Sequence, residues 1–233
     1  MNRLAPTLAA GLALAAAPVP RPAEGPAAGV AADRAGSWKI DWGRTPRGRP
    51  YVGRVEFTPL GNCWQVQYKY DDGTSYTGVG IVVRDLILAV AWTNDFREDG
   101  YGVALYARDP DTGGFEGWWC QPDGRQGEEN LGPPAELAGT HAIRGSSGGS
   151  VRIAPLRNSK VTYEMAWDMP DGDYPGFAVE LEEDAGMIAS LWGTDAGGGA
   201  ALYSLRELSK GKLHGWWANT GDTKQGEEVL KRR

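Results

Sequence analysis

The chain contains few of the residues that enzymes commonly use at their active sites. Its 233 residues include 2 histidines and 2 cysteines. These four residues are widely separated and do not have the spacing of a zinc site. No catalytic or cofactor motif is recognisable elsewhere in the sequence. We therefore predict no catalytic residue, no cofactor and no metal site.

The chain also lacks an excess of positive charge. Its formal net charge is -6, and neither sign forms a long block. A nucleic-acid partner requires a basic face on the protein, and an anionic membrane surface requires a polybasic segment. Both classes of partner are therefore excluded by composition.

Long hydrophobic runs are missing except at the N-terminus. Arg3 precedes an apolar run over residues 4–19, which is too short and too interrupted by proline for a comfortable membrane span. A linker rich in proline, alanine and glycine follows. We interpret residues 1–32 as a signal peptide and flexible leader, with a disordered tail as the alternative. This interpretation predicts an exported protein, either periplasmic, on the cell surface or secreted, with no membrane span in its mature chain.

Amphipathic helices longer than about two turns are absent from the pattern, whereas strand signals are frequent. The 34 glycines and 10 tryptophans separate short apolar runs, which is typical of strands joined by tight turns. The clearest alternation places Trp64, Val66 and Tyr68 on one side of a strand and Gln65 and Gln67 on the other. The sequence therefore predicts an all-β protein.

A second apolar alternation indicates which side of another strand faces the core. Phe177, Val179 and Leu181 alternate with Glu180 and Glu182. Since carboxylates on a strand are expected to face water, we predict that both glutamates lie on the solvent side.

One pattern of glycines and aromatic residues occurs twice in the chain. The segments 102–106, 117–119 and 126–131 return about 98 residues later as 199–203, 215–217 and 225–230. Self-similarity at a fixed spacing is typical of repeated supersecondary units. We therefore predict a β-meander repeat at 36–131, a proline-rich linker at 132–138 and a second repeat at 139–231.

Each repeat is expected to contain about seven or eight short strands joined by hairpin turns. A long antiparallel meander tends to close on itself, because closure removes its exposed edges. We therefore predict a small up-and-down barrel for each repeat. One composite barrel or sandwich built jointly by both repeats is the alternative.

The repeat resembles one found in exported bacterial proteins of unknown role, some of which are labelled fibronectin-binding. The resemblance rests on the motifs W-x-V-x-Y at 64–68, Y-x-G-x-G at 76–80 and G-x-W at 117–119. It is also similar in style to avidin-like and lipocalin-like barrels. The resemblance covers nearly all of the chain after the leader and implies fold and export, but no reaction. The second repeat departs from it at its start, where His141 replaces an aromatic residue.

Both cysteines lie in the first repeat, and the corresponding positions of the second, near Ser159 and Ala218, carry none. Presence of both in one copy and absence of both from the other is typical of a bonded pair. An exported protein also meets oxidising conditions. We therefore predict a disulfide between Cys63 and Cys120. Two separate thiols are the alternative, because distant strands cannot be bridged.

Two tryptophan pairs provide the candidate ligand-binding residues. Trp118 and Trp216 each precede a tryptophan assigned to the core, and adjacent strand residues face opposite sides. One member of each pair, Trp118 and Trp216 on this assignment, should therefore point outward, or into a cavity if the two sides are reversed. There an indole can support a sugar ring or another flat ligand. Packing against the neighbouring repeat is the alternative interpretation.

Two kinds of carboxylate cluster could serve catalysis or bind calcium, but a structural role is favoured for both. The pairs Glu128-Glu129 and Glu227-Glu228 recur, and paired carboxylates can hydrolyse glycosides. Neighbours on a strand point apart, however, so a structural role is favoured. The sequence Asp171-Gly172-Asp173 has oxygen ligands for calcium, but it lies where a hairpin turn is needed.

We therefore predict a non-enzymatic binding protein of the bacterial cell envelope or its surroundings. Its ligand is expected to be a glycan, a small molecule or a host or matrix protein. A hydrolase that uses the repeated glutamate pairs is one alternative. A structural protein without a ligand is the other.

Overall fold

The structure is a computed structural model that describes residues 34–93, 100–134, 136–145, 148–181, 186–193 and 197–232. These residues form seventeen strands and one short 3-10 helix, η1 (Leu208–Lys210). The predicted leader, residues 1–32, lies outside the described residues. Among the residues that are described, no helix is long and apolar enough to cross a membrane.

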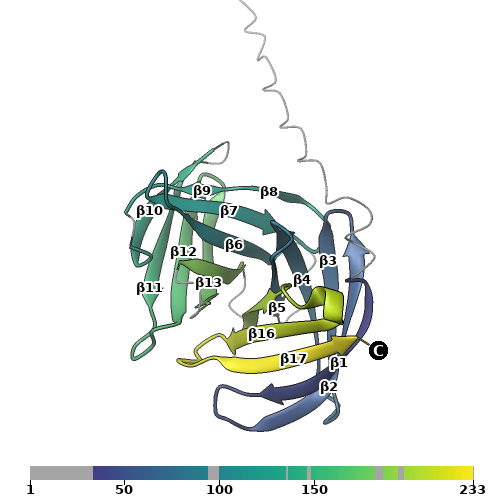
Figure 1. Cartoon of the computed structure of the whole chain (residues 1–233). Coiled ribbons are helices and arrows are strands. Elements are labelled where there is room, and N and C mark those ends of the chain that lie inside the picture. Colours follow the sequence, from purple (N-terminus) through teal and green to yellow (C-terminus); the bar gives the residue numbers. More distant parts are fainter. Residues whose placement is uncertain are drawn as a thin grey trace, which may run out of the picture.

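Eight antiparallel strands close into what we call the first barrel (Figure 1). Their order around the barrel is β1-β17-β16-β15-β5-β4-β3-β2. Five come from the first repeat and three from the second: β1 (Gly36–Arg44), β2 (Pro50–Leu60), β3 (Cys63–Tyr70), β4 (Ser75–Val83) and β5 (Ile87–Thr93), then β15 (Gly198–Ser204), β16 (Lys212–Asn219) and β17 (Gly226–Arg232).

The remaining strands form the second barrel. The short strands β8 and β9 both pair with β7, one after the other along its length, and β6 pairs with β7 to close the barrel. Its strands from the first repeat are β6 (Gly102–Asp109), β7 (Gly114–Cys120), β8 (Gln126–Glu128) and β9 (Asn130–Leu131). Its strands from the second repeat are β10 (Gly139–Arg144), β11 (Ser150–Pro155), β12 (Thr162–Met169), β13 (Gly172–Glu180) and β14 (Met187–Trp192).

The prediction of two small antiparallel barrels is confirmed. The two repeats exchange their last strands, so that each barrel contains strands of both repeats. Each barrel combines the first five strands of one repeat with the last strands of the other. β5 pairs with β15, and β14 pairs with β6, so the chain changes barrel after β5 and again after β14. The repeats at 36–131 and 139–231 are therefore units of sequence, and each barrel draws on both.

Period-two alternation fills the interior of each barrel. In β3, Trp64, Val66 and Tyr68 are buried, whereas Gln65 and Gln67 face outward, as the sequence predicts. The interior of the first barrel is a cluster of such inward side chains, and the second barrel has its own cluster.

A third hydrophobic cluster lies between the barrels and buries the outer faces of several strands. Phe177, Val179 and Leu181 belong to this cluster, so their side of β13 packs against the other barrel. The opposite side of β13 faces the interior of the second barrel, where the Glu180 carboxylate accepts a hydrogen bond from the Tyr163 hydroxyl. The predicted solvent side of β13 is therefore the side that faces the barrel interior. Ala178 on that side is fully buried, and Glu180 at the end of the strand is half-buried. Its companion, Glu182, lies outside the described residues.

The duplicated glycines leave room for aromatic rings on neighbouring strands. A Cβ on Gly102 would lie 2.6 Å from the ring of Trp192, and one on Gly199 would lie 2.3 Å from the ring of Trp92. These distances are too short for any side chain. Further pairs of the same kind are Gly117 with Tyr106, Gly215 with Tyr203, Gly127 with Trp119 and Gly226 with Trp217. The repeated sequence pattern therefore records a repeated set of glycine–aromatic contacts between strands.

The predicted disulfide is present, and it joins the two barrels. Cys63 lies on β3 of the first barrel and Cys120 on β7 of the second, with their Cα atoms 6.5 Å apart. Both belong to the cluster between the barrels. In the second repeat, the matching strand β12 begins at Thr162, whose hydroxyl donates to the backbone carbonyl of Asp222 in the first barrel at 2.8 Å. At the start of β3 the two barrels are thus joined by a disulfide, and at the start of the matching strand β12 they are joined by a hydrogen bond.

His141 fills the place of Trp38 without preventing closure of the second barrel. The Trp38 indole N–H donates to the Arg34 carbonyl, and His141 Nε2 lies 2.9 Å from the carbonyl of Leu137, also four residues upstream. The His141 ring is fully buried and packs edge-on against Phe115. β10 is shorter than β1, yet it still pairs with β9 and β11.

Candidate functional site

Each barrel contains a pocket at one end, and both pockets are lined by aromatic rings. The first-barrel pocket has a volume of about 220 Å³ and the second-barrel pocket about 340 Å³. Four equivalent lining positions carry the same residue in the two repeats: Trp217 and Trp119, Trp92 and Trp192, Tyr76 and Tyr174, and Asp72 and Asp171. Strand exchange gives each pocket residues from both repeats, so neither repeat supplies a complete site.

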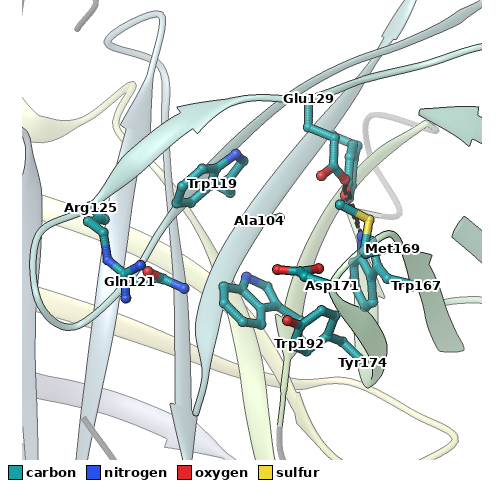
Figure 2. Close-up of a pocket in the computed structure, with 11 residues that line it drawn as sticks. Ala104, Trp119, Gln121, Arg125, Glu129, Trp167, Met169, Asp171, Tyr174 and Trp192 are labelled. Carbon is teal, nitrogen blue, oxygen red and sulfur yellow. Dashed lines mark hydrogen bonds between the residues drawn. The ribbon is translucent and has the colours of Figure 1, made fainter. Parts of the chain in front are cut away.

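Aromatic rings from four different strands surround the second-barrel pocket. Figure 2 shows Trp119 of β7, Trp167 of β12, Tyr174 of β13 and Trp192 of β14 around the cavity. The carboxylate of Asp171, from the turn between β12 and β13, projects into the space between these rings.

A buried glutamate forms part of the same wall. Glu129, between β8 and β9, is 8% exposed and lines the pocket. Its Oε1 accepts hydrogen bonds from the Tyr106 hydroxyl and from the Trp167 indole N–H, the latter at 3.1 Å. Oε2 takes no part in these bonds, and Figure 2 shows a carboxylate oxygen of Glu129 directed toward the cavity. Burial raises the pKa of the Glu129 carboxyl, and the bonds from Tyr106 and Trp167 oppose that shift.

The first barrel has the equivalent glutamate, but there it is closed off. Glu228 is 1% exposed and does not line the first-barrel pocket. Tyr203 donates to its Oε1, and Tyr51 donates to its Oε2 at 2.8 Å. Tyr51 also accepts a hydrogen bond from the Trp217 indole at 2.6 Å. Burial raises the pKa of the Glu228 carboxyl, again against the hydrogen bonds.

Tyr51 is the residue that separates Glu228 from the pocket, and strand length explains its presence. β2 extends back to Pro50 and therefore carries Tyr51, which packs edge-on against Tyr70 and Trp217. The matching strand β11 begins only at Ser150. In the second repeat Tyr51 corresponds to Ser147, which lies outside the described residues.

Charged groups are unevenly distributed around the second-barrel pocket. Figure 2 shows Arg125 and Gln121 at one end, whereas Asp171 and Glu129 lie toward the other. Arg125 is the one basic residue among the described lining residues, and its Nε donates to the carboxylate of Asp123. The pKa of the Tyr174 hydroxyl is raised, first by burial and then by Asp171. The wall of the second-barrel pocket therefore holds two carboxyl groups and one guanidinium group among the described residues.

The predicted ligand-binding tryptophans lie outside both pockets. Trp118 and Trp216 are on the outer faces of β7 and β16, half-buried against the cluster between the barrels. The Arg84 guanidinium lies 5.6 Å from the centre of the Trp118 ring, and the His214 ring lies 4.2 Å from that of Trp216. The outward orientation is confirmed, and their role in ligand binding stays a prediction.

The repeated glutamate pairs point apart, as adjacent residues on a strand should. Glu128 is exposed on the outside, and Glu227 accepts a bond from His214 at 2.6 Å, whereas Glu129 and Glu228 face the barrel interiors. In the described parts of the chain, no group of three His, Cys, Asp or Glu side chains is placed to hold a metal ion.

Sequence reasoning missed the aromatic wall of the second-barrel pocket. It assigns Trp119 to the core and Asp171 to a turn, and it assigns Trp167, Tyr174 and Trp192 to no site. Recurrence of Trp92 as Trp192 and of Tyr76 as Tyr174 was the available signal. These residues converge only through strand exchange, so their proximity could not be derived from spacing.

Comparison with known proteins adds no further constraint. Neither a protein family, nor a curated protein, nor a solved structure matches this chain.

Proposed function

We propose that this chain is a non-enzymatic binding protein whose ligand is a small molecule held in the second-barrel pocket. The observation that supports it is a cavity of about 340 Å³ whose wall combines aromatic rings with two carboxylates. Small-molecule sites are concave, mostly apolar and lined by a few well-placed polar groups.

Export is part of the same proposal. The apolar N-terminal run is typical of a signal peptide, and disulfides persist in oxidising compartments. The Cys63–Cys120 bond supports that location. The resemblance to exported bacterial repeats agrees with it.

A ligand panel tests the proposed function on the full chain. Neutral sugars, organic ammonium ions, fatty acids and matrix proteins are added while tryptophan fluorescence and thermal unfolding are recorded. A small molecule that binds the folded chain should raise the melting temperature, and the rise should keep growing with ligand concentration. Binding should be lost in Trp119→Ala and kept in the matched variant Trp217→Ala. A panel without any response, or a response that survives Trp119→Ala, would overturn the proposal.

One observation favours glycoside hydrolysis as a second candidate. Glu129 and Asp171 line the same cavity, and two carboxylates in one cleft can act as acid and base. The raised pKa of Glu129 suits the acid. This pair replaces the adjacent glutamates as the residues to test. Release of reducing sugar from oligosaccharides, abolished in Glu129→Gln, would establish hydrolysis in place of simple binding.

A further inference from the structure

We infer that the second-barrel pocket binds an alkylated ammonium ion, held between aromatic faces and carboxylates. This inference rests on the proposed function and adds the chemical class of the ligand. It is drawn from the lining residues, their charges and the contrast between the two barrels.

The aromatic wall provides the first argument. Trp119, Trp167, Trp192 and Tyr174 belong to four strands and surround one space (Figure 2). Indole and phenol faces carry partial negative charge and attract cations, and a cage of such rings is well suited to an ammonium group with alkyl substituents. Alkyl groups also gain from removal of apolar surface from water. Four rings therefore favour a bulky, weakly hydrated cation.

The charges around the pocket provide the second argument. Glu129 directs a carboxylate oxygen toward the cavity, and Asp171 projects its carboxylate between the rings. Arg125 would repel a cation, but its charge is offset by the bonded carboxylate of Asp123, and it lies at the far end of the cavity. The chain as a whole carries a net charge of -6, which also favours the approach of a cation.

The first barrel provides an internal comparison. It repeats the aromatic positions and has Asp72 in place of Asp171, but Tyr51 occupies the space in front of Glu228. The Tyr51 ring packs edge-on against Tyr70 and Trp217 there. The first-barrel pocket is therefore smaller and has no access to its buried glutamate, and we expect it to bind the cation much more weakly.

A pair of probes that differ in charge but hardly in shape tests the inference. Choline is titrated into the full chain by calorimetry, alongside 3,3-dimethylbutan-1-ol, in which a carbon atom replaces the nitrogen. Tetramethylammonium and a neutral sugar complete the set. We expect one binding site for choline and at least about tenfold weaker binding of the neutral alcohol, because a cation loses its attraction to the rings when the charge is removed.

Matched variants locate the site. Asp171→Asn keeps the shape of the rim and removes its charge, and it should weaken choline binding about tenfold. Asp72→Asn makes the same change at the equivalent position of the first barrel and should leave the affinity unchanged. Thermal unfolding of both variants checks that they remain folded.

The outcomes separate the inference from the function on which it rests. Equal affinity for choline and the neutral alcohol, or an unchanged affinity in Asp171→Asn, would overturn the assignment of a cation. Binding of the neutral sugar without binding of choline would also overturn it. In each of these cases the pocket still binds a small molecule. Failure of every compound in the wider panel would overturn both.

Discussion

The two barrels share one set of aromatic positions but differ in what lies in front of the buried glutamate. In the first barrel Tyr51 bonds to Glu228 and separates it from the pocket. In the second barrel Glu129 lines the pocket directly, and the cavity is larger, about 340 Å³ against 220 Å³. Among the described residues, the extended end of β2, which carries Tyr51, is thus the feature that covers the glutamate in one barrel and has no counterpart in the other.

The comparison also shows how duplication can separate stability from function. Both glutamates accept hydrogen bonds from a tyrosine, Tyr203 or Tyr106, at equivalent positions. In the first barrel the network is complete on both carboxylate oxygens, which suits a structural role. In the second barrel the bonds from Tyr106 and Trp167 are both accepted by Oε1 of Glu129. Under the proposed function, one copy of the duplicated unit serves packing and the other serves binding.

The largest expected effect comes from filling a glycine contact that both barrels share. In Gly117→Ala a Cβ would lie 2.0 Å from the backbone oxygen of Glu129, and in Gly215→Ala it would lie 2.4 Å from the Tyr203 ring. We expect each to lower the free energy of unfolding by about 3 kcal/mol or more, because packed strands cannot move apart freely.

Gly132→Ala is the control for these two variants, since the nearest atom to its Cβ is the end of the flexible Arg144 side chain. Denaturant unfolding measures all three. A small loss in Gly117→Ala together with a large one in Gly215→Ala would show that the two barrels do not share this frame.

Removal of the link between the barrels should have the next largest effect. Replacement of Cys63 and Cys120 by alanine opens a covalent loop with a sequence separation of 57 residues. We expect a loss of about 2–4 kcal/mol, as is usual for such loops. Unfolding of the wild type in a reducing agent should approach that of the double variant, whereas an unchanged midpoint in both would contradict the structural role of the bond.

Opening the first barrel directly tests the comparison between the pockets. Tyr51→Ser removes the ring that covers Glu228 and one of its two hydrogen bonds. We expect stability to fall by about 2 kcal/mol, because a buried carboxylate loses a donor. Calorimetry should then detect a second, weaker choline site. If the opened barrel gains no affinity, the accessible glutamate is not what distinguishes the two pockets.

The smallest predicted effect concerns how the free energy of unfolding depends on pH. This dependence should differ between the wild type and variants in which Glu228 or Glu129 is replaced by glutamine. A raised pKa means that the folded state holds the proton more tightly than the unfolded state does. The corresponding stability is therefore complete below the ordinary pKa of glutamate and is lost as pH rises through the raised value.

Glu228→Gln should abolish this loss, worth about 1.4 kcal/mol for each unit by which the pKa is raised. Unfolding curves measured from acid to neutral pH check it, with Glu129→Gln as the less buried counterpart. A wild type whose stability rises with pH over that range would contradict the sign.

Sequence alone gave the all-β class and the two barrels, because local alternation such as that of Trp64, Val66 and Tyr68 decides strands, and closure follows from exposed edges. It could not give the exchange of strands. The segments 102–106 and 199–203 are nearly identical, so each fits beside either β5 or β14. Local preference cannot decide between two equivalent partners.

The same limit explains the errors about individual side chains. Glu180 was assigned to solvent on the rule that a strand has one buried face, but the contact between the barrels buries the other face as well. Trp118 was selected because it points outward, which is correct, yet the pocket is lined by its neighbour Trp119. Which side of a barrel strand binds a ligand depends on the space inside, and no pattern in the sequence reports that space.

The most direct test of the account uses the indole N–H resonances of the chain's 10 tryptophans during a choline titration. If the second-barrel pocket is the site, the signals of Trp119, Trp167 and Trp192 should move together and saturate. Shifts confined to Trp92 and Trp217 would place the ligand in the first barrel, and shifts confined to Trp118 and Trp216 would place it on the outer surface. Either of these results, or a spectrum that choline leaves unchanged, would contradict the central claim.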